Sequence, residues 1–377
     1  MSAERPLTIL TVNAGSSSIR LALFEARGGE LRRVRASHGD AVTDRDAELD
    51  RLIADAKIDV VAHRVVHGGA RLRATCRLDE SVAATITRMI PVAPLHNPAT
   101  LAWAAACRAR LRGATALAVF DSGFFATLPA VAATYALPEA VRARWELGRL
   151  GFHGLAHRSM WEALRALAEG SAARTARVVS FQLGSGCSVA ALRDGRPIDT
   201  SMGFTPLEGL VMGTRAGDVD AGILLLLMRE AGSSAADLER MLTSEGGLAG
   251  VSGGPSDVRA LLASDDPRAR LALDVYAYRA RKYLGAYLAV LGGCDAVLFG
   301  GGAGEHAPEL RRRILVDLEA LGLVLDDAAN ASAAAPARIS AAGSRTEIWV
   351  VPTDEESVLA REAAAWADRP PAETLTR

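Results

Sequence analysis

A strand-turn-strand unit occurs twice in this chain, and the repetition constrains the fold more than any other feature of the sequence. The stretch LTILTVNAGSSSIRLALFE, near the start, has two β-rich runs joined by an Asn/Gly/Ser turn. The stretch RVVSFQLGSGCSVAALRDG, in the middle, repeats the pattern, with Gly184 and Ser185 standing where Gly15 and Ser16 stand in the first copy. A duplicated unit predicts two similar domains that face each other.

Two further strands are each followed by a helix. An apolar run ends at Phe299 and leads into a glycine-rich turn, after which a helix begins near Pro308. Another run ends at Pro352 and enters the last helix through Thr353 or Asp354, each a suitable N-cap. Alanine- and leucine-rich stretches predict helices at about 97–112, 157–169, 219–231 and 268–291. This alternation predicts an α/β fold with mixed sheets, whose ligands bind at the loop ends of strands.

Charge and composition exclude several classes of function. The 377 residues carry 43 basic and 44 acidic side chains, so no excess field exists to hold a nucleic acid or an anionic membrane surface. The most apolar window, AGILLLLM at 221–228, is too short to span a bilayer, and the start of the chain has no long apolar stretch. Four separated cysteines without a CxxC pair indicate free thiols. We therefore expect a soluble, cytoplasmic protein.

The lysine count excludes one mechanism of nucleotide binding. Lys57 and Lys282 are the only lysines, and neither lies in a GxxxxGK[ST] phosphate loop. Any phosphate chemistry must therefore depend on arginine.

The two duplicated turns are candidates for phosphate binding. NAGSSS at 13–18 and LGSGCS at 183–188 offer backbone N–H groups and hydroxyls at close range. Either turn alone is more typical of an ordinary β-turn. Their relation by duplication favours a shared phosphate cleft.

Several other polar residues stand at expected strand or helix ends. Arg64 follows a β-branched run between two histidines and needs an anionic partner, which is either a ligand or a salt-bridging carboxylate. Arg215 lies between glycines, where a bidentate grip on phosphate competes with an ion pair to a following aspartate. His153 could be a packed histidine at a helix start, and Asp121, after a strand, could be a simple N-cap.

Taken together, these segments resemble the acetate kinase family. The motifs VNAGSSS, HRVVHGG, PLHNP, FDSGF, GFHG, DTSMGFTPLEGLVMGTR, GVSGGPSDVR and VPTDEE occur in that family's order across the whole chain. The resemblance implies two duplicated ribonuclease-H-like domains of mixed sheets flanked by helices, as in sugar kinases, Hsp70 and actin, around an active-site cleft. We expect residues 1–125 plus about 358–377 in the first domain and about 126–357 in the second, nucleotide-binding one.

The resemblance also implies roles for individual residues. Arg64 and Arg215 would hold the substrate carboxylate and the transferring phosphoryl group, His153 would stabilise that group, and Asp121 would orient the reacting centre. Mg²⁺ (or Mn²⁺) would be held by Glu355 with Asn13, and by Asp121. The acyl pocket would be formed by Val66, Leu95, Phe152 and Pro206. Nucleotide or phosphate contacts would come from Asn13, Ser16, Ser18, Gly184, Ser185, Gly186, Asp257, Arg259, Gly302, Gly304 and His306.

Some positions depart from the family pattern. Gln182 and Ser185 stand where the family has a histidine and an asparagine, His306 replaces an asparagine, and Phe125 replaces a histidine. Most changes concern the phosphoryl-donor side.

The resemblance implies an acetate kinase that uses ATP, Mg²⁺ and acetate and forms a homodimer. The alternatives are a kinase for propionate or another short acyl group, a member using another donor such as pyrophosphate, and a noncatalytic nucleotide-binding protein. The intact acyl-side motifs argue against the last of these.

Overall fold

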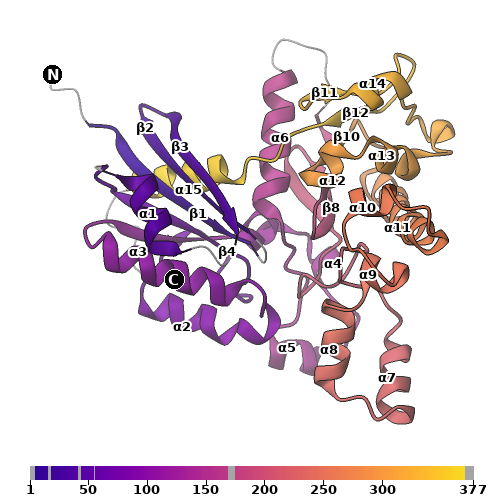
Figure 1. Ribbon diagram of the computed structural model, residues 1–377, viewed down its shortest axis with the longest axis horizontal. Helices are drawn as coiled ribbons and strands as arrows, with labels where there is room; N and C mark the ends of the chain where they lie inside the picture. The colour runs from indigo at the N-terminus through magenta and orange to yellow at the C-terminus, as the bar shows by residue number, and fades with distance from the viewer. Residues whose placement is uncertain (1–4, 16–17, 41–43, 55, 169–174, 370–377) are drawn as a thin grey trace. The chain divides into compact units, whose positions relative to one another are not determined.

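The computed structural model describes residues 5–15, 18–40, 44–54, 56–168 and 175–369. The chain divides into two units, residues 1–126 with 354–377 and residues 127–353 (Figure 1). Each unit contains one six-stranded sheet with helices packed on it. The predicted α/β fold with mixed sheets is confirmed.

The first unit is built on a sheet of order β3-β2-β1-β4-β6-β5. β1 pairs antiparallel with β2 and parallel with β4, and β4 pairs parallel with β6. The elements are β1 Leu7–Ala14, β2 Ser18–Arg27, β3 Glu30–Asp40, α1 Arg45–Ile53, β4 Val60–Val65, β5 Cys76–Arg77, α2 Glu80–Arg88, a 3-10 turn Ile90–Val92, α3 Asn97–Arg110, β6 Thr115–Phe120, a 3-10 helix Asp121–Thr127, and α15 Glu355–Ala367.

Alternation along β1 divides this sheet into two faces. Leu10 and Val12 join a core with Leu49 of α1 and Trp103 of α3. Side chains of the intervening positions point to the opposite face, because successive residues of a strand alternate. There Asn13 meets the start of α15, which packs across β1, β2 and β4 (Figure 1). This face carries the polar groups described below.

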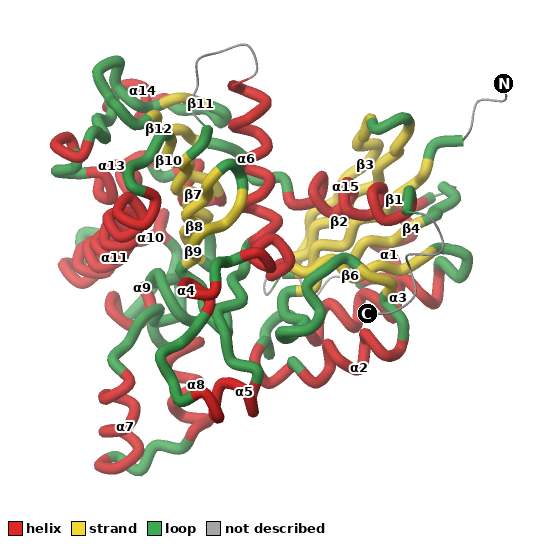
Figure 2. The backbone as a smooth tube through the Cα atoms, turned by 180° about the vertical axis from the view of Figure 1, so that it is seen from behind, coloured by secondary structure: helices red, strands yellow, loops and turns green. Residues whose placement is uncertain are grey.

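The second unit repeats the topology with the order β11-β12-β10-β7-β8-β9. β7 pairs antiparallel with β8 and parallel with β10, as β1 pairs with β2 and β4, so the predicted duplication is confirmed (Figure 2). The elements are α4 Ala130–Ala133, α5 Glu139–Trp145, α6 Gly154–Ala168, β7 Arg177–Leu183, β8 Cys187–Arg193, β9 Arg196–Thr200, α7 Ala221–Glu230, α8 Ala235–Thr243, α9 Gly247–Ser252, α10 Val258–Leu262, α11 Pro267–Leu291, β10 Ala296–Gly300, α12 Gly301–His306, α13 Pro308–Leu315, a 3-10 turn Glu319–Leu321, α14 Asp327–Ser332, β11 Ala337–Arg338 and β12 Glu347–Val350.

The structure corrects one sequence expectation. The glycine run after Phe299 is not a free turn: β10 ends at Gly300 and helix α12 begins at once. Gly301 has φ +76°, and a Cβ there would lie 2.7 Å from the carbonyl oxygen of Leu183. Glycine is therefore required because the helix starts against the neighbouring strand.

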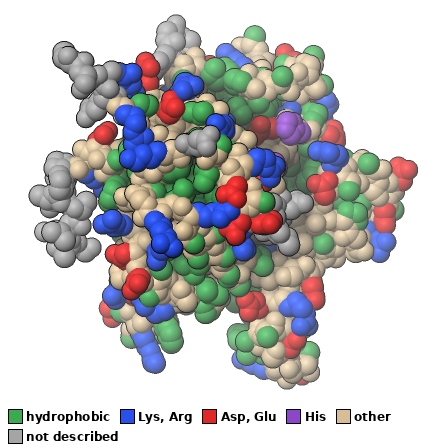
Figure 3. Space-filling model, turned by 60° about the vertical axis from the view of Figure 1, so that its left-hand side comes forward, with side chains coloured by type: hydrophobic (Ala, Val, Ile, Leu, Met, Phe, Trp, Pro, Cys, Tyr) green, Lys and Arg blue, Asp and Glu red, His purple; other side chains and the backbone are tan. Residues whose placement is uncertain are grey.

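The remaining expectations on elements are met. Asp354 caps α15 through the amide of Ser357, which decides between the two predicted caps. The four predicted helical stretches correspond to α3, α6, α7 and α11. Within the described residues, no helix is both long and apolar enough to cross a membrane. Figure 3 shows basic and acidic side chains interspersed on the face it draws, in keeping with the net charge of −1.

Candidate active site

A charged cluster lies in the first unit, at the ends of β1, β4 and β6. Arg64, at the end of β4, donates through Nη2 to Asp121 Oδ2 at 2.7 Å and through Nη1 to Asn13 Oδ1 at 3.0 Å. Asn13 Nδ2 donates in turn to Glu355 Oε2 at 2.7 Å and Glu356 Oε1 at 2.8 Å, at the start of α15. All five residues are buried. The parallel strands thus bring together side chains that are far apart in sequence.

The cluster holds more negative than positive charge. Burial acts to lower the pKa of Arg64, but the carboxylates of Asp121, Glu355 and Glu356 outweigh it and raise this pKa. Burial raises the pKa of Glu355, and the Asp121 and Glu356 carboxylates add to the rise, while Arg64 opposes it at 3.6 Å. Three carboxylates share one guanidinium, so a further cation would be stabilised here.

This donor set fits a hard divalent cation. Carboxylate oxygens suit Mg²⁺, which keeps waters and substrate oxygens among its ligands. The described part of the chain has no group of three or more His, Cys, Asp or Glu residues placed to hold a metal ion, so waters and substrate would have to complete the ligands. The side-chain oxygen Oδ1 of Asn13 already accepts from Arg64, so in this arrangement the side-chain nitrogen Nδ2 of Asn13 positions Glu355 and Glu356.

The duplicated turn of the second unit opens into a cavity of about 320 Å³. Gly184 and Ser185 line it together with residues in and next to helices α10 and α12. Six predicted nucleotide residues line it, namely Gly184, Ser185, Asp257, Arg259, Gly302 and His306. Gly304 does not line it: a Cβ there would lie 3.3 Å from the Phe299 backbone, and its carbonyl accepts from Arg311.

Two cationic or potentially cationic groups meet at the end of this turn. A Cβ on Gly186 would lie 2.5 Å from Arg215 Nη2 and 3.2 Å from His153 Nε2, so only glycine leaves both groups in place. His153 has φ +57°, an unfavourable conformation for a non-glycine residue that often occurs at functional sites. The arrangement places donors where a phosphate would approach the turn.

Arg215 differs from Arg64 in its partners. It donates to the carbonyl oxygen of Pro206, and no described carboxylate forms an ion pair with it. Asp220 caps α7 and Asp218 pairs with Arg279, so the predicted alternative of an aspartate ion pair is not observed. Burial lowers the pKa of Arg215. A desolvated guanidinium of this kind favours a bound anion.

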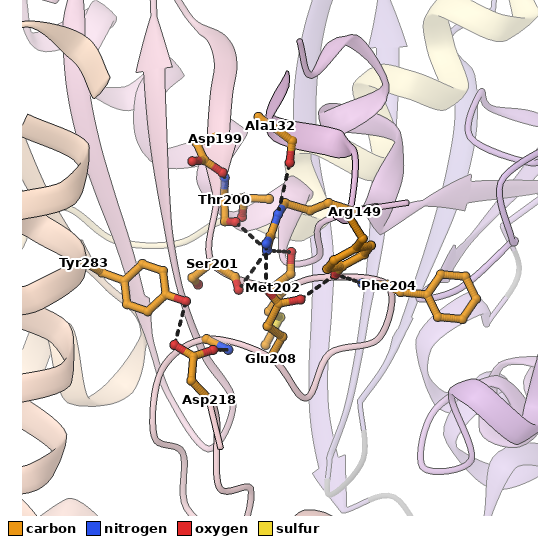
Figure 4. Close-up of polar contacts among 12 residues, drawn as sticks. Ala132, Arg149, Asp199, Thr200, Ser201, Met202, Phe204, Glu208, Asp218 and Tyr283 are labelled. Atoms are coloured by element: carbon orange, nitrogen blue, oxygen red, sulfur yellow. Dashed lines mark hydrogen bonds and ion pairs between the residues drawn. The ribbon is translucent and has the colours of Figure 1, made fainter. Parts of the chain in front are cut away.

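A part-buried group of polar contacts centred on Arg149 supports the loop that carries Pro206 and Arg215 (Figure 4). Arg149 Nη1 donates to the carbonyls of Thr200, Ser201 and Met202 at 3.1, 3.3 and 3.3 Å, and Nη2 pairs with Glu208. The amide of Phe204 donates to the hydroxyl of Tyr135 at 2.9 Å. Phe204 and Glu208 lie on either side of Pro206 in the sequence, so these contacts fix the loop around that residue.

Some supporting residues escaped the sequence analysis. Ser188 contacts both His153 and His157, Glu356 shares Asn13 with Glu355, and Arg311 holds the carbonyls of α12 at Gly304 and Glu305. Two signals were available: His157 lies four residues after His153, which directly precedes helix α6, and Glu356 is adjacent to Glu355. The contacts of Ser188 and Arg311 depend on tertiary structure alone.

The other predicted residues are distributed over both units. Val66 and Leu95 belong to the first unit, with Val66 buried and Leu95 49 % exposed, while Phe152 and Pro206 belong to the second. Ser18 begins β2, and its carbonyl accepts from the Gly15 amide at 2.8 Å. Ser16 lies outside the described residues.

A larger cavity, of about 490 Å³, lies on α11 and α13. Its three arginines are engaged: Arg281 donates to the carbonyls of Arg313 and Ile314, Arg313 pairs with Asp274 and Glu309, and Arg279 pairs with Asp218. It therefore offers less to an anion than the cavity beside Arg215.

Comparisons with known proteins identify the family of the chain. The acetokinase family model matches residues 33–361. The acetate kinase of Solibacter usitatus is 39 % identical over 94 % of this chain and 97 % of its own, and that of Chloroherpeton thalassium is 43 % identical over 85 % and 78 %.

Solved structures give the same result. Porphyromonas gingivalis acetate kinase has a TM-score of 0.82 and 34 % identity, covering 96 % of this chain and 100 % of its own. A propionate kinase from Francisella tularensis subsp. tularensis has a TM-score of 0.82 and 30 % identity, covering 95 % and 99 %.

The fold and the matches define a phosphotransferase whose acceptor is a carboxyl group. The chain belongs to the acetokinase family.

Proposed function

We propose that this protein catalyses reversible, Mg²⁺-dependent transfer of a phosphoryl group from ATP to acetate, giving acetyl phosphate and ADP. The observation that carries the proposal is Arg215: a desolvated guanidinium with no described carboxylate partner, close to Gly186 and His153. Such a group stabilises the charge of a phosphoryl group in transit.

The proposed reaction needs little covalent help from the protein. A carboxylate is already ionised near neutral pH, so it attacks phosphorus without a general base. Arg64 would orient this carboxylate, and Asp121 would hold Arg64 through its 2.7 Å ion pair. Arg215 would neutralise charge on the equatorial oxygens of the phosphoryl group, and His153 would stabilise them as a hydrogen-bond donor.

The nucleotide would occupy the cavity of about 320 Å³. Gly184 and Ser185 would meet its phosphates, and Gly302 and His306 of α12 would meet the adenosine. Glu355 and Asp121, with Glu356 beside them, would hold Mg²⁺ directly or through water. Bound there, the ion would neutralise phosphate charge during transfer.

The acyl side favours a short substrate. Val66, Leu95, Phe152 and Pro206 would leave room for one or two carbons beyond the carboxylate, so propionate would be tolerated and butyrate poor. One methylene in a tight pocket discriminates by about 1–3 kcal/mol. Val66→Ala should widen the range, and equal kcat/KM for acetate and butyrate in the unaltered protein would contradict the assignment.

Hydroxamate trapping of acyl phosphate tests the function directly. Acetate, propionate and butyrate are each offered with ATP, GTP and pyrophosphate in parallel. Product with acetate and ATP is expected. If only pyrophosphate supports product formation, the assignment of ATP as donor is wrong and the assignment of acetate as acceptor remains. If no donor supports product formation, a noncatalytic nucleotide-binding protein is favoured.

The donor side should bind ATP loosely. Gln182 and Ser185 offer neutral groups, and a neutral hydrogen bond contributes about 0.5–1.5 kcal/mol against about 1.5–3 for one to a charged group. Gln182 Oε1 is buried and accepts no hydrogen bond, so a histidine there would break no bond at this atom. The double variant Gln182→His/Ser185→Asn should lower the KM for ATP by roughly tenfold, with the KM for acetate as internal control. An unchanged or higher KM for ATP would remove these two positions from donor binding.

We also propose a cytoplasmic homodimer. The four cysteines are free, which suits a reducing compartment. Helix α7 exposes Ile223, Leu225, Leu226 and Met228, an apolar surface that a second copy would cover. Analytical ultracentrifugation should give twice the chain mass, and Leu226→Glu should reduce it to the mass of one chain. A monomeric wild-type protein would contradict this assembly.

A further inference from the structure

Four side chains form a continuous hydrogen-bonded row beneath the turn of the second unit. His153 Nδ1 lies 2.9 Å from Ser188 Oγ, and Ser188 Oγ lies 2.8 Å from His157 Nε2. His157 Nδ1 lies 3.0 Å from Ser180 Oγ. His157, Ser180 and Ser188 are completely buried. The row therefore runs from the protein interior to the ring of His153.

The row can be protonated in two directions, and the two differ at His153. A serine hydroxyl has one proton, so each serine donates to one neighbour and accepts from the other. The direction is decided at Ser180, whose proton can go to His157 Nδ1 at 3.0 Å or to Met160 Sδ at 3.9 Å. The Ser180–His157 bond forms in either direction, and the opposite one adds only a donation from Ser180 to the thioether sulfur of Met160, a weak acceptor. We therefore take Ser180 as the donor to His157.

The rest of the row follows from that choice. With Nδ1 of His157 accepting, its Nε2–H donates to Ser188, and the Ser188 hydroxyl then donates to His153 Nδ1. His153 is left with its proton on Nε2, the atom that lies 3.2 Å from the position a Cβ on Gly186 would occupy. In the opposite direction a neutral His153 would present a lone pair to an incoming phosphate.

We propose that Ser188, His157 and Ser180 are positioning residues that hold His153 as the neutral Nε2–H tautomer, so that it donates to the phosphoryl group without needing to be protonated. The proposal rests on the proposed function for the role of His153. The row also orients the ring, whose backbone is in the left-handed region at φ +57°. Fixing a catalytic imidazole through its other nitrogen is a recognised way to set its tautomer.

Nitrogen NMR of the whole chain labelled with ¹⁵N-histidine reports the tautomer in the unaltered protein. The chain has seven histidines, and His153→Gln identifies the resonance of interest. Nε2–H on both His153 and His157 is the expected result. Nδ1–H on His153 in the unaltered protein would overturn the proposed direction.

Kinetics of Ser188→Ala and Ser180→Ala test the effect on transfer. Loss of a group that orients a catalytic residue typically costs roughly 10–100-fold, and we expect this fall in kcat for Ser188→Ala, with KM for acetate and ATP nearly unchanged. A smaller fall is expected for Ser180→Ala, which acts through two more hydrogen bonds. The matched control for both serine variants is Thr346→Val, which removes another buried hydroxyl of the same unit, one that donates to the Cys294 carbonyl. Thr346→Val should leave kcat unchanged.

These experiments distinguish failure of the proposed row from failure of the proposed function. A wild-type kcat in Ser188→Ala, together with an unchanged His153 tautomer, would overturn the row as a positioning device. Loss of kcat in Thr346→Val to the same extent would do so too, because the effect would then be one of general packing. Absence of acyl phosphate formation by the unaltered protein would overturn the proposed function, while the NMR result would still report the tautomer.

Discussion

The two units share one topology, but only the first surrounds its arginine with carboxylates. In the first unit Arg64 is paired with Asp121 and lies near two glutamates, so the cluster is rich in negative charge. In the second unit Arg215 meets a backbone carbonyl and, among the described residues, no carboxylate. A duplicated scaffold thus gives one site that attracts a cation and one that attracts an anion. This division suits a reaction that needs both a divalent ion and a stabilised phosphoryl group.

The largest expected effect is on transfer itself. Arg64→Ala and Arg215→Ala should each reduce kcat/KM by orders of magnitude, since a charged contact in a desolvated site contributes roughly 3–5 kcal/mol to the transition state. Lysine at either position should not restore activity, because it lacks the planar fork. The hydroxamate assay measures the loss. Near-native turnover in either alanine variant would take that arginine out of the mechanism.

Stability should separate the two arginines. Arg64→Ala leaves buried carboxylates without their cation and should lower the free energy of unfolding by about 3–5 kcal/mol. Arg215→Ala removes a desolvated charge that has no carboxylate partner and should leave stability unchanged or slightly raised. Calorimetry resolves the two units if they unfold separately. Equal destabilisation by both substitutions would contradict the contrast in charge.

The sequence predicted the strands and helices better than it predicted the side-chain contacts between them. Duplication, strand alternation and caps are local patterns, so the two sheets and the Asp354 cap follow from them. Helix α12 was predicted as a turn because glycine is a poor helix former, and packing against Leu183 overrides that preference. The row through Ser188 could not be predicted, since residues with no sequence relation meet only when β8 lies beside α6.

Gly186 tests the anion-attracting site without touching a charge. Gly186→Ala should reduce kcat roughly 10- to 100-fold, because its Cβ would lie 2.5 Å from Arg215 Nη2 and displace this guanidinium. The backbone of Gly186 is not in the left-handed region, and the end of an arginine moves easily, so stability should change little. Gly285→Ala in α11 is the control, since a Cβ there meets nothing within 4 Å. Full activity of Gly186→Ala would mean that Arg215 need not lie at the turn.

The smallest effect concerns the surplus negative charge of the first unit. The pKa of Glu355 is raised in the folded protein above its ordinary value of 4.5. As the pH rises from 4.5 through the raised pKa, Glu355 therefore ionises less readily in the folded than in the unfolded protein, and the free energy of unfolding falls. Glu355→Gln removes this cost and should raise the free energy of unfolding by about 1 kcal/mol at neutral pH, while it abolishes transfer. The gain should shrink as the pH is lowered toward 4.5, where Glu355 of the wild-type protein takes up a proton itself. The control is Glu239→Gln, which neutralises an exposed carboxylate of α8 and should change neither quantity. Thermal melts over this pH range measure the difference, and a Glu355→Gln protein less stable than wild type at neutral pH would show that Arg64 already balances the cluster without a metal ion.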